Sequence, residues 1–142
     1  RPPSSTLFPY TTLFRSTIYD FNNCPESNLV LGEVINYPGK WSSYPPHGHP
    51  QPEIYHYRFL PEQGFGLGMM GYEDVVSVKN GDTIVITDGV VHSQTAAPGY
   101  AMYYAWAIRH LDGKPWTSFD FDPDHTWVMD PKNDSKIWPY PK

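Results

Sequence analysis

Short runs of alternating apolar and polar residues recur along the chain, separated by turns rich in glycine, proline and asparagine. Alternation with a period of two is typical of half-buried β-strands, because successive side chains on a strand point to opposite faces. The pattern predicts strands over residues 17–21, 28–37, 53–60, 65–70, 74–78, 83–87, 100–109 and 116–121. Because helix is expected to be minor, the chain is predicted to form an all-β domain of eight or nine short strands, with a loose, proline-rich tail.

The run 53–60, EIYHYRFL, shows which face of one strand is inside. Alternation places the odd-numbered residues, beginning with Glu53, Tyr55 and Tyr57, on one face, and the even-numbered residues, including Arg58, on the other. We expect the odd-numbered face to line the interior of a barrel. Further along, an Asn-Gly pair at 80–81 predicts a tight turn that leads through the strand 83–87 to His92.

Four side chains that favour metal ions are spaced along these candidate strands. His47 and His49 project to the same side of an extended segment. Glu53, six residues after His47, points to that side as well if the intervening turn keeps the two-residue alternation. A fourth ligand, His92, comes from a different part of the predicted sheet. Imidazole and carboxylate groups suit zinc, manganese or iron, and four of them leave positions open for water or substrate. The sequence predicts one divalent metal ion held by His47, His49, Glu53 and His92.

Composition narrows the class of protein. The 142 residues suffice for about one domain, and 16 prolines and 11 glycines with only 18% charged residues favour strands and turns. A net charge of -5 without a basic stripe argues against nucleic acid or an anionic membrane as partner. The single cysteine excludes an internal disulfide. The longest apolar run, 101–108, is far shorter than the roughly 18 residues of a membrane span. We expect a cytoplasmic protein.

Residues 1–16 differ in character from the rest of the chain. The segment 6–16, TLFPYTTLFRS, resembles the conceptual translation of a sequencing-library adapter read in frame, and the chain does not begin with Met. We interpret residues 1–16 as a non-native leader and residues 17–142 as the domain, a fragment whose N-terminal part is missing. The alternative is an ordinary strand, because leucine, phenylalanine, tyrosine and threonine all favour extended backbone.

Two spaced motifs carry a family resemblance. The pattern G-x5-TxG-xx-H runs from Gly81 to His92, with Thr87 where cupins often have proline. The pattern G-x5-HxH-x3-E keeps its histidines and its glutamate, but Trp41 stands in place of its glycine. Together they resemble the two cupin motifs. The resemblance implies a double-stranded β-helix, also called a jelly-roll barrel.

Longer stretches make the resemblance more specific. GEVINYPGKWSSYPPHGH, EIYHYRFLPEQGFG, APGYAMYY and DPDHTW closely resemble the C-terminal half of the KduI/IolB family, over residues 28–127. The resemblance implies aldose-to-ketose isomerisation of 5-deoxy-D-glucuronate in myo-inositol catabolism, on a bicupin whose metal lies in the half present here. Only Pro-Gln-Pro separates His49 from Glu53, where the family has a longer acidic insertion, so the mouth of the site is expected to differ in shape.

An isomerase of this type needs a group that transfers protons. Tyr55 and Tyr57 follow Glu53 on the predicted ligand face, and Tyr103 or Tyr104 comes from the strand after the last histidine ligand. A phenol held there would donate or relay a proton to the enediolate that isomerisation forms. We take Tyr55, Tyr57 and Tyr103 as the candidate catalytic residues.

The carboxylate of a sugar acid calls for a guanidinium or ammonium group. Arg58, Arg109 and Lys114 are the cations near the predicted site, but strand parity turns Arg58 to the outer face. We therefore take Arg109 as a substrate-binding candidate, together with Gln63, which precedes a glycine-rich strand expected to line the pocket.

Three other histidines have structural interpretations. His56 and His110 are expected at the surface or at a sheet edge, since no neighbouring residue pairs them with the metal ligands. His125 lies in the turn sequence DPDH, where aspartate caps are routine. Its use is expected to be structural.

Two other function classes stay open. A metal cupin of different chemistry, such as an iron dioxygenase, would use the same ligands to bind oxygen and would consume it. A non-catalytic half-enzyme would bind a sugar acid without turnover. The expected partner is a small sugar acid in either an isomerase or a binding protein, nucleic acid and membrane are not expected, and self-association into a homo-oligomer stays open.

Overall fold

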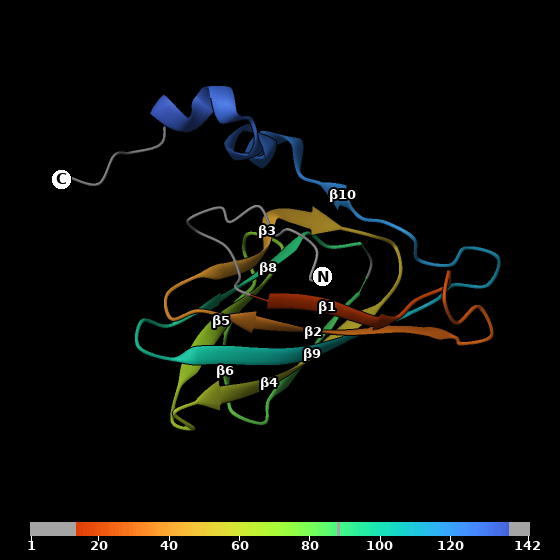
Figure 1. Ribbon diagram of the computed structural model, residues 1–142, viewed down its shortest axis with the longest axis horizontal. Coiled ribbons are helices and arrows are strands. Elements are labelled where there is room, and N and C mark those ends of the chain that lie inside the picture. Colours follow the sequence, from red (N-terminus) through yellow and green to blue (C-terminus); the bar gives the residue numbers. More distant parts are fainter. Residues whose placement is uncertain (1–13, 88, 137–142) are drawn as a thin grey trace.

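The computed structural model describes residues 14–87 and 89–136. Within these residues, ten β-strands are followed by two short 3-10 helices (Figure 1). The elements are β1 (Phe14–Tyr19), β2 (Leu29–Asn36), β3 (Trp41–Gly48), β4 (Glu53–Leu60), β5 (Phe65–Met70), β6 (Val75–Lys79), β7 (Thr83–Ile86), β8 (His92–Ala96), β9 (Ala101–Arg109), β10 (Asp120–Phe121), η1 (Pro123–Met129) and η2 (Pro131–Lys136). The all-β prediction is confirmed. No helix in the described parts of the chain has the length and apolar character needed to cross a membrane.

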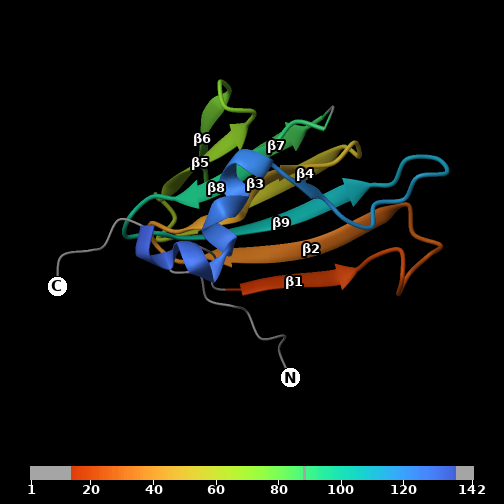
Figure 2. The ribbon, with the colours of Figure 1, turned by 90° about the horizontal axis from the view of Figure 1, so that it is seen from above.

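The strands form two antiparallel sheets with five strands each. One sheet has the order β1-β2-β9-β4-β7 and the other the order β10-β3-β8-β5-β6. Figures 1 and 2 show the long strands β2, β9 and β4 side by side, with η1 and η2 outside the two sheets. The hydrophobic core lies between the sheets and includes Val34, Tyr57, Val78, Met102 and Ile108. Consecutive strands often lie in different sheets, which brings residues from distant parts of the sequence to one interior.

The predicted inner face of β4 is confirmed, and β9 shows the same alternation of buried and less buried residues. On β4, the odd-numbered residues from Glu53 to Phe59 are buried, whereas Ile54 and Arg58 are exposed. On β9, the even-numbered residues, such as Tyr104 and Trp106, are buried. Direct pairing of β4 with β9 places both sets on the same inner surface.

The alternation pattern did not predict the strands β3 and β8. The inward residues of these strands are polar, including Ser42, His92 and Gln94, all of which are buried. A strand with a polar inner face shows no hydrophobic alternation, so it escapes a search for that pattern. In β3, the pairing with β8 shifts register between Ser42 and His47, where four residues bulge out of the ladder.

Both ends of the domain differ from the predicted boundaries. The first strand is shifted to Phe14–Tyr19, so it includes three residues of the segment interpreted as a leader; the origin of that segment stays a prediction, and residues 1–13 lie outside the described range. The predicted strand 116–121 is wrong except for Asp120–Phe121, because the amide of Trp116 donates to a side chain, not to a strand. The tail forms η1 and η2 up to residue 136 instead of a loose coil.

Gly32 on β2 leaves room for the indole ring of Trp106. A Cβ atom at Gly32 would lie 2.2 Å from Trp106 Cζ2 and 2.4 Å from the Ser16 carbonyl oxygen. We predict that Gly32→Ala lowers the free energy of unfolding by about 1–3 kcal/mol, because the ring must move in a packed interior. Chemical denaturation measures this, with Ser118→Ala at an exposed position as control. Equal stability of the two variants would contradict the prediction.

Candidate metal centre

Three of the four predicted ligands meet between the sheets. Glu53 begins β4, His92 begins β8, and His49 follows β3 directly. Glu53 Oε2 lies 3.1 Å from His49 Nε2 and 3.2 Å from His92 Nε2. Candidate ligand atoms of all three residues lie within 4.8 Å of one another, and all three residues are buried. The fold therefore concentrates two imidazoles and a carboxylate at one end of the barrel.

Backbone carbonyl groups orient the histidine rings. The Nδ1 atoms of His47, His49 and His92 lie 3.2, 2.9 and 3.0 Å from the carbonyl oxygens of Pro45, Gln51 and Val90. A carbonyl oxygen only accepts hydrogen bonds, so each Nδ1 is the protonated nitrogen. In a neutral ring this leaves a lone pair on Nε2, which for His49 and His92 faces Glu53. Such an outer contact is how proteins fix the tautomer of a metal-binding histidine.

Glu53 carries the negative charge of the cluster. Burial raises the pKa of its carboxyl group, but the facing His49 and His92 rings more than offset this, so the pKa lies below its ordinary value. In addition, His92 Nε2 is buried without a hydrogen-bond partner. If both rings are neutral with Nδ1 protonated, two Nε2 lone pairs face the carboxylate, and this arrangement repels unless protons or a metal ion lie among the three groups. The residues present therefore fit a divalent metal ion.

His47 lies beside this cluster. The group of ligand atoms within 4.8 Å does not include it, although its ring centroid is 4.9 Å from that of His92. Its ring instead stacks on Phe119, with centroids 4.1 Å apart and planes 21° apart. Burial lowers the pKa of His47 to about 3, and the nearby His92 contributes in the same direction. His47 is thus a neutral imidazole next to the three-residue cluster.

A cavity of about 170 Å³ opens next to the cluster. Its wall includes His47, His49 and Glu53 and the aromatic residues Tyr55, Tyr104, Trp106, Trp116 and Phe119. The Tyr55 hydroxyl lies 3.4 Å from Ser43 Oγ, and Tyr104 donates to Ser42 Oγ at 2.8 Å. Burial raises the pKa of Tyr104 to about 12 and that of Tyr55 well above its ordinary value. Both phenols are proton donors at neutral pH.

Of the predicted catalytic tyrosines, only Tyr55 lines this cavity. Tyr57 is deeper in the core and donates its hydroxyl hydrogen to Gln94 Oε1. Tyr103 points to the outer face of β9 and donates to Glu33 Oε2 at 3.3 Å, so it does not line this cavity. Strand alternation places its neighbour Tyr104 on the inner face instead.

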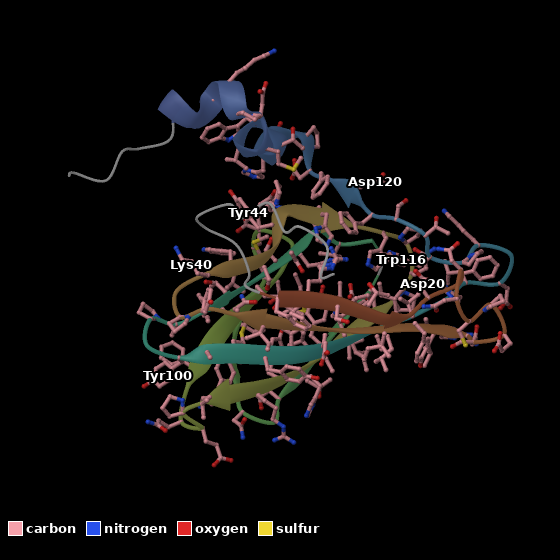
Figure 3. All side chains as sticks on the ribbon, viewed as in Figure 1. Asp20, Lys40, Tyr44, Tyr100, Trp116 and Asp120 are labelled. Atoms are coloured by element: carbon pink, nitrogen blue, oxygen red, sulfur yellow. The ribbon has the colours of Figure 1, made fainter. Side chains whose placement is uncertain are left out.

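The two predicted substrate-binding residues do not reach the site. Arg109 ends β9 on the outward side and is exposed. Gln63 is exposed in the turn after β4. The eight residues of β4 lead away from Glu53, over roughly 25 Å of extended chain. Gly64 packs against Tyr100, which Figure 3 places at the opposite end of the barrel from Trp116.

Some cavity residues carried no signal in the sequence. Trp116 and Phe119 lie in irregular backbone between β9 and β10, so no periodicity predicts where they point. Within the described residues, Arg15 is the one lysine or arginine that lines the cavity, and its guanidinium carbon lies 5.8 Å from the centre of the Trp106 ring. Because Arg15 belongs to the segment interpreted as a leader, we assign it no role.

The remaining histidines are separate from the cluster. His56 is half-buried on the outer side of β4 and its Nδ1 lies 2.8 Å from Thr83 Oγ1. His125 lies in η1 next to the Tyr72 ring. The expectation that His110 is a surface or edge residue is wrong: it is buried, and its Nδ1 accepts the amide hydrogen of Trp116 at 2.9 Å. This partner could not be predicted from sequence patterns, because the contact depends on how the chain turns after β9.

Comparison with known sequences identifies relatives. The profile of the KduI/IolB family matches residues 16–128. A protein named 5-deoxy-glucuronate isomerase from Geobacillus thermodenitrificans is 36% identical over an alignment of 124 residues, and the match covers 76% of this chain and 43% of that protein. A protein of the same name from Bacillus licheniformis is 32% identical over an alignment of 121 residues, and the match covers 75% of this chain and 44% of that protein. The chain spans less than half the length of these relatives.

Solved structures share the fold. An IolB-like protein from Salmonella typhimurium superposes with a TM-score of 0.74 at 24% identity, covering 82% of this chain and 48% of that one. A cupin-like protein from Thermotoga maritima gives a TM-score of 0.61 at 19% identity, covering 76% of this chain and 74% of that one. The predicted cupin barrel is confirmed.

Proposed function

The chain belongs to the KduI/IolB family, and from this premise we propose that it is the metal-bearing half of an enzyme that isomerises 5-deoxy-D-glucuronate. One observation carries the proposal: His49, Glu53 and His92 converge beside a cavity of suitable chemistry, in a chain whose relatives are named for that reaction. We further propose that the ion is zinc, manganese or iron, that the pathway is myo-inositol catabolism, and that the enzyme works in the cytoplasm.

His49, Glu53 and His92 would hold the ion, and His47 stands close enough to join them after a ring movement. A divalent ion bound there supplies a Lewis acid for the carbonyl and the adjacent hydroxyl of the sugar. The protein sets up this chemistry before substrate arrives: the carbonyl contacts at Nδ1 keep the Nε2 atoms turned inward.

Tyr55 is the proposed proton-transfer residue. Isomerisation moves a hydrogen between neighbouring carbons and leaves negative charge on oxygen in between. The Tyr55 hydroxyl faces the cavity with only a long, 3.4 Å contact to Ser43, so it is free to hydrogen-bond that oxygen. Its raised pKa keeps it protonated, which makes it a donor instead of a resting base. Tyr104, held by Ser42, completes the polar wall.

Aromatic residues keep this site dry. Trp106 and Trp116 are almost fully buried, and Phe119 covers the His47 ring. Excluding water strengthens each polar contact with a bound sugar and protects an enediolate from unwanted protonation. The mixture of aromatic wall and few polar groups suits a small polyhydroxylated acid.

The proposal is tested by assay of the purified chain with zinc, manganese and iron supplied in turn. We expect 5-deoxy-D-glucuronate to be converted to its 2-ketose, seen by NMR as loss of the aldehyde carbon signal, only with metal present. No conversion with any metal would contradict the isomerase proposal for this chain. Oxygen uptake without ketose formation would favour oxygenase chemistry instead.

A non-catalytic half-enzyme is the second candidate. The coverage of the relatives favours it, because the chain spans 43% of its Geobacillus thermodenitrificans relative and the remainder of such a relative can complete a pocket. Calorimetric binding of the sugar acid by the metal-loaded chain, without any turnover, identifies this case.

A further inference from the structure

The segment 110–121, here called the strap, lies against the candidate ligands. It leaves the end of β9 and ends at β10, which pairs with β3 at His47. On the way, Phe119 stacks on the His47 ring at 4.1 Å, and the Trp116 ring meets the His49 ring edge-on at 6.1 Å. Figure 3 shows Trp116 on this segment, above the strands β1 and β2. The strap thus forms the outer wall of the cavity over two histidines.

Two buried side chains hold the middle of the strap. His110 Nδ1 accepts the backbone N–H of Trp116 at 2.9 Å, and Gln51 Nε2 donates to the Lys114 carbonyl oxygen at 3.0 Å. His110 is 5% and Gln51 4% exposed. Because residues 115–119 have no regular secondary structure, side-chain contacts of this kind replace the ladder that a strand would use.

Gln51 also contacts a candidate ligand. While its side chain holds Lys114, its own carbonyl oxygen lies 2.9 Å from His49 Nδ1. One residue therefore joins the orientation of the His49 ring to the position of the strap that covers it. The proposed mechanism assigns no role to Gln51 or His110, and neither lines the cavity.

We propose that Gln51 and His110 are positioning residues that hold the strap closed over His47 and His49 and so control access to the ligand nitrogens. The metal-binding role of these histidines rests on the proposed function, whereas the positioning of the strap does not. Loss of either anchor frees Trp116 and Phe119 to move away, and the two histidines become reachable from solvent. His92 contacts neither of these strap residues through its ring and stays covered.

Chemical modification of the metal-free full chain by diethyl pyrocarbonate, which acylates free imidazole nitrogens, tests this directly. Mass spectrometry gives the rate at each histidine. Gln51→Met keeps the length and removes the donor, and His110→Phe keeps a ring and removes the acceptor. Each is expected to raise the rates at His47 and His49 roughly five- to tenfold, the population change that loss of one buried hydrogen bond produces.

A matched variant separates the hydrogen bond from general packing. His110→Asn places an amide oxygen close to the position of Nδ1 and is expected to retain most of the protection of His47 and His49. Unchanged rates in both Gln51→Met and His110→Phe would overturn the proposal, as would equal rates in His110→Asn and His110→Phe. If His92 also reacts fast in one of the two anchor variants, that variant is unfolded. The rates at His47 and His49 in the other anchor variant then decide the test. A parent chain that binds no metal contradicts the proposed function, yet the reactivity result stands on its own.

Discussion

Replacing His92 with alanine is expected to lower divalent-metal affinity about 100-fold or more, the scale of losing a direct ligand. His92 is 1% exposed at the start of β8, its ring is fixed by the Val90 carbonyl, and its Nε2 lies 3.2 Å from Glu53 without a hydrogen-bond partner. Elemental analysis after zinc, manganese and iron are offered in turn should find nearly one ion per parent chain and little in His92→Ala.

The matched control is His56→Ala. This variant also loses one imidazole from the same barrel, but His56 lies on the outer side and contacts Thr83. It should retain the metal content of the parent. Equal metal in His92→Ala and His56→Ala would show that the ion, if bound, lies elsewhere, and the metal-dependent mechanism would then fail.

His47→Ala distinguishes three ligands from four. The ring stacks on Phe119 outside the cluster of close ligand atoms. If His47 stays there, His47→Ala should lose much less metal affinity than His92→Ala. A loss as large as that of His92→Ala would mean that His47 turns inward and joins the ion. Calorimetric titration with zinc measures both losses on one scale.

The sequence predicted the architecture through its apolar alternation. Strands β4 and β9 were both predicted, β4 with its correct inner face, because buried residues alternate there with less buried ones. The strands that carry His47 and His92, β3 and β8, were missed for the opposite reason. The inner face of β8 carries His92 and Gln94, both buried. Polar residues on an inner face remove the apolar alternation by which a strand is recognised in the sequence.

Site residues could be predicted where spacing along the sequence sets their positions, and could not be predicted where contacts between distant segments set them. His49 and Glu53 are close in sequence, and the parity argument brought them together. Arg109 was placed by proximity in sequence, yet its parity on β9 turns it outward. The strap shows most clearly what the sequence could not predict. Its course depends on contacts of His110 and Gln51 with backbone atoms of Trp116 and Lys114, and no sequence pattern predicts such contacts.

Tyr55→Phe is expected to reduce kcat of sugar-acid isomerisation by roughly 100-fold or more while leaving metal content unchanged, the usual range for losing a positioned proton-transfer group. Its ring packs against Tyr104 with centroids 4.7 Å apart, and phenylalanine keeps that packing. Only the hydroxyl is lost, and among the described residues its hydrogen-bond contact is the long one to Ser43. Steady-state kinetics with the metal-loaded chain measures the effect, and the free energy of unfolding should change little.

Two further variants decide whether the effect belongs to Tyr55 or to tyrosines of the barrel in general. Tyr103→Phe removes a hydroxyl that contacts Glu33 on the outer face, so kcat should stay within about twofold. Tyr57→Phe removes a donor to buried Gln94; we expect it to cost about 1 kcal/mol of stability, the typical value of one hydrogen bond, with a modest effect on kcat. A Tyr57→Phe enzyme as impaired as Tyr55→Phe would move the proton-transfer role deeper into the barrel. Full activity of Tyr55→Phe would exclude the cavity phenol as the donor, because substitution by phenylalanine leaves the cavity wall in place and takes away only its proton.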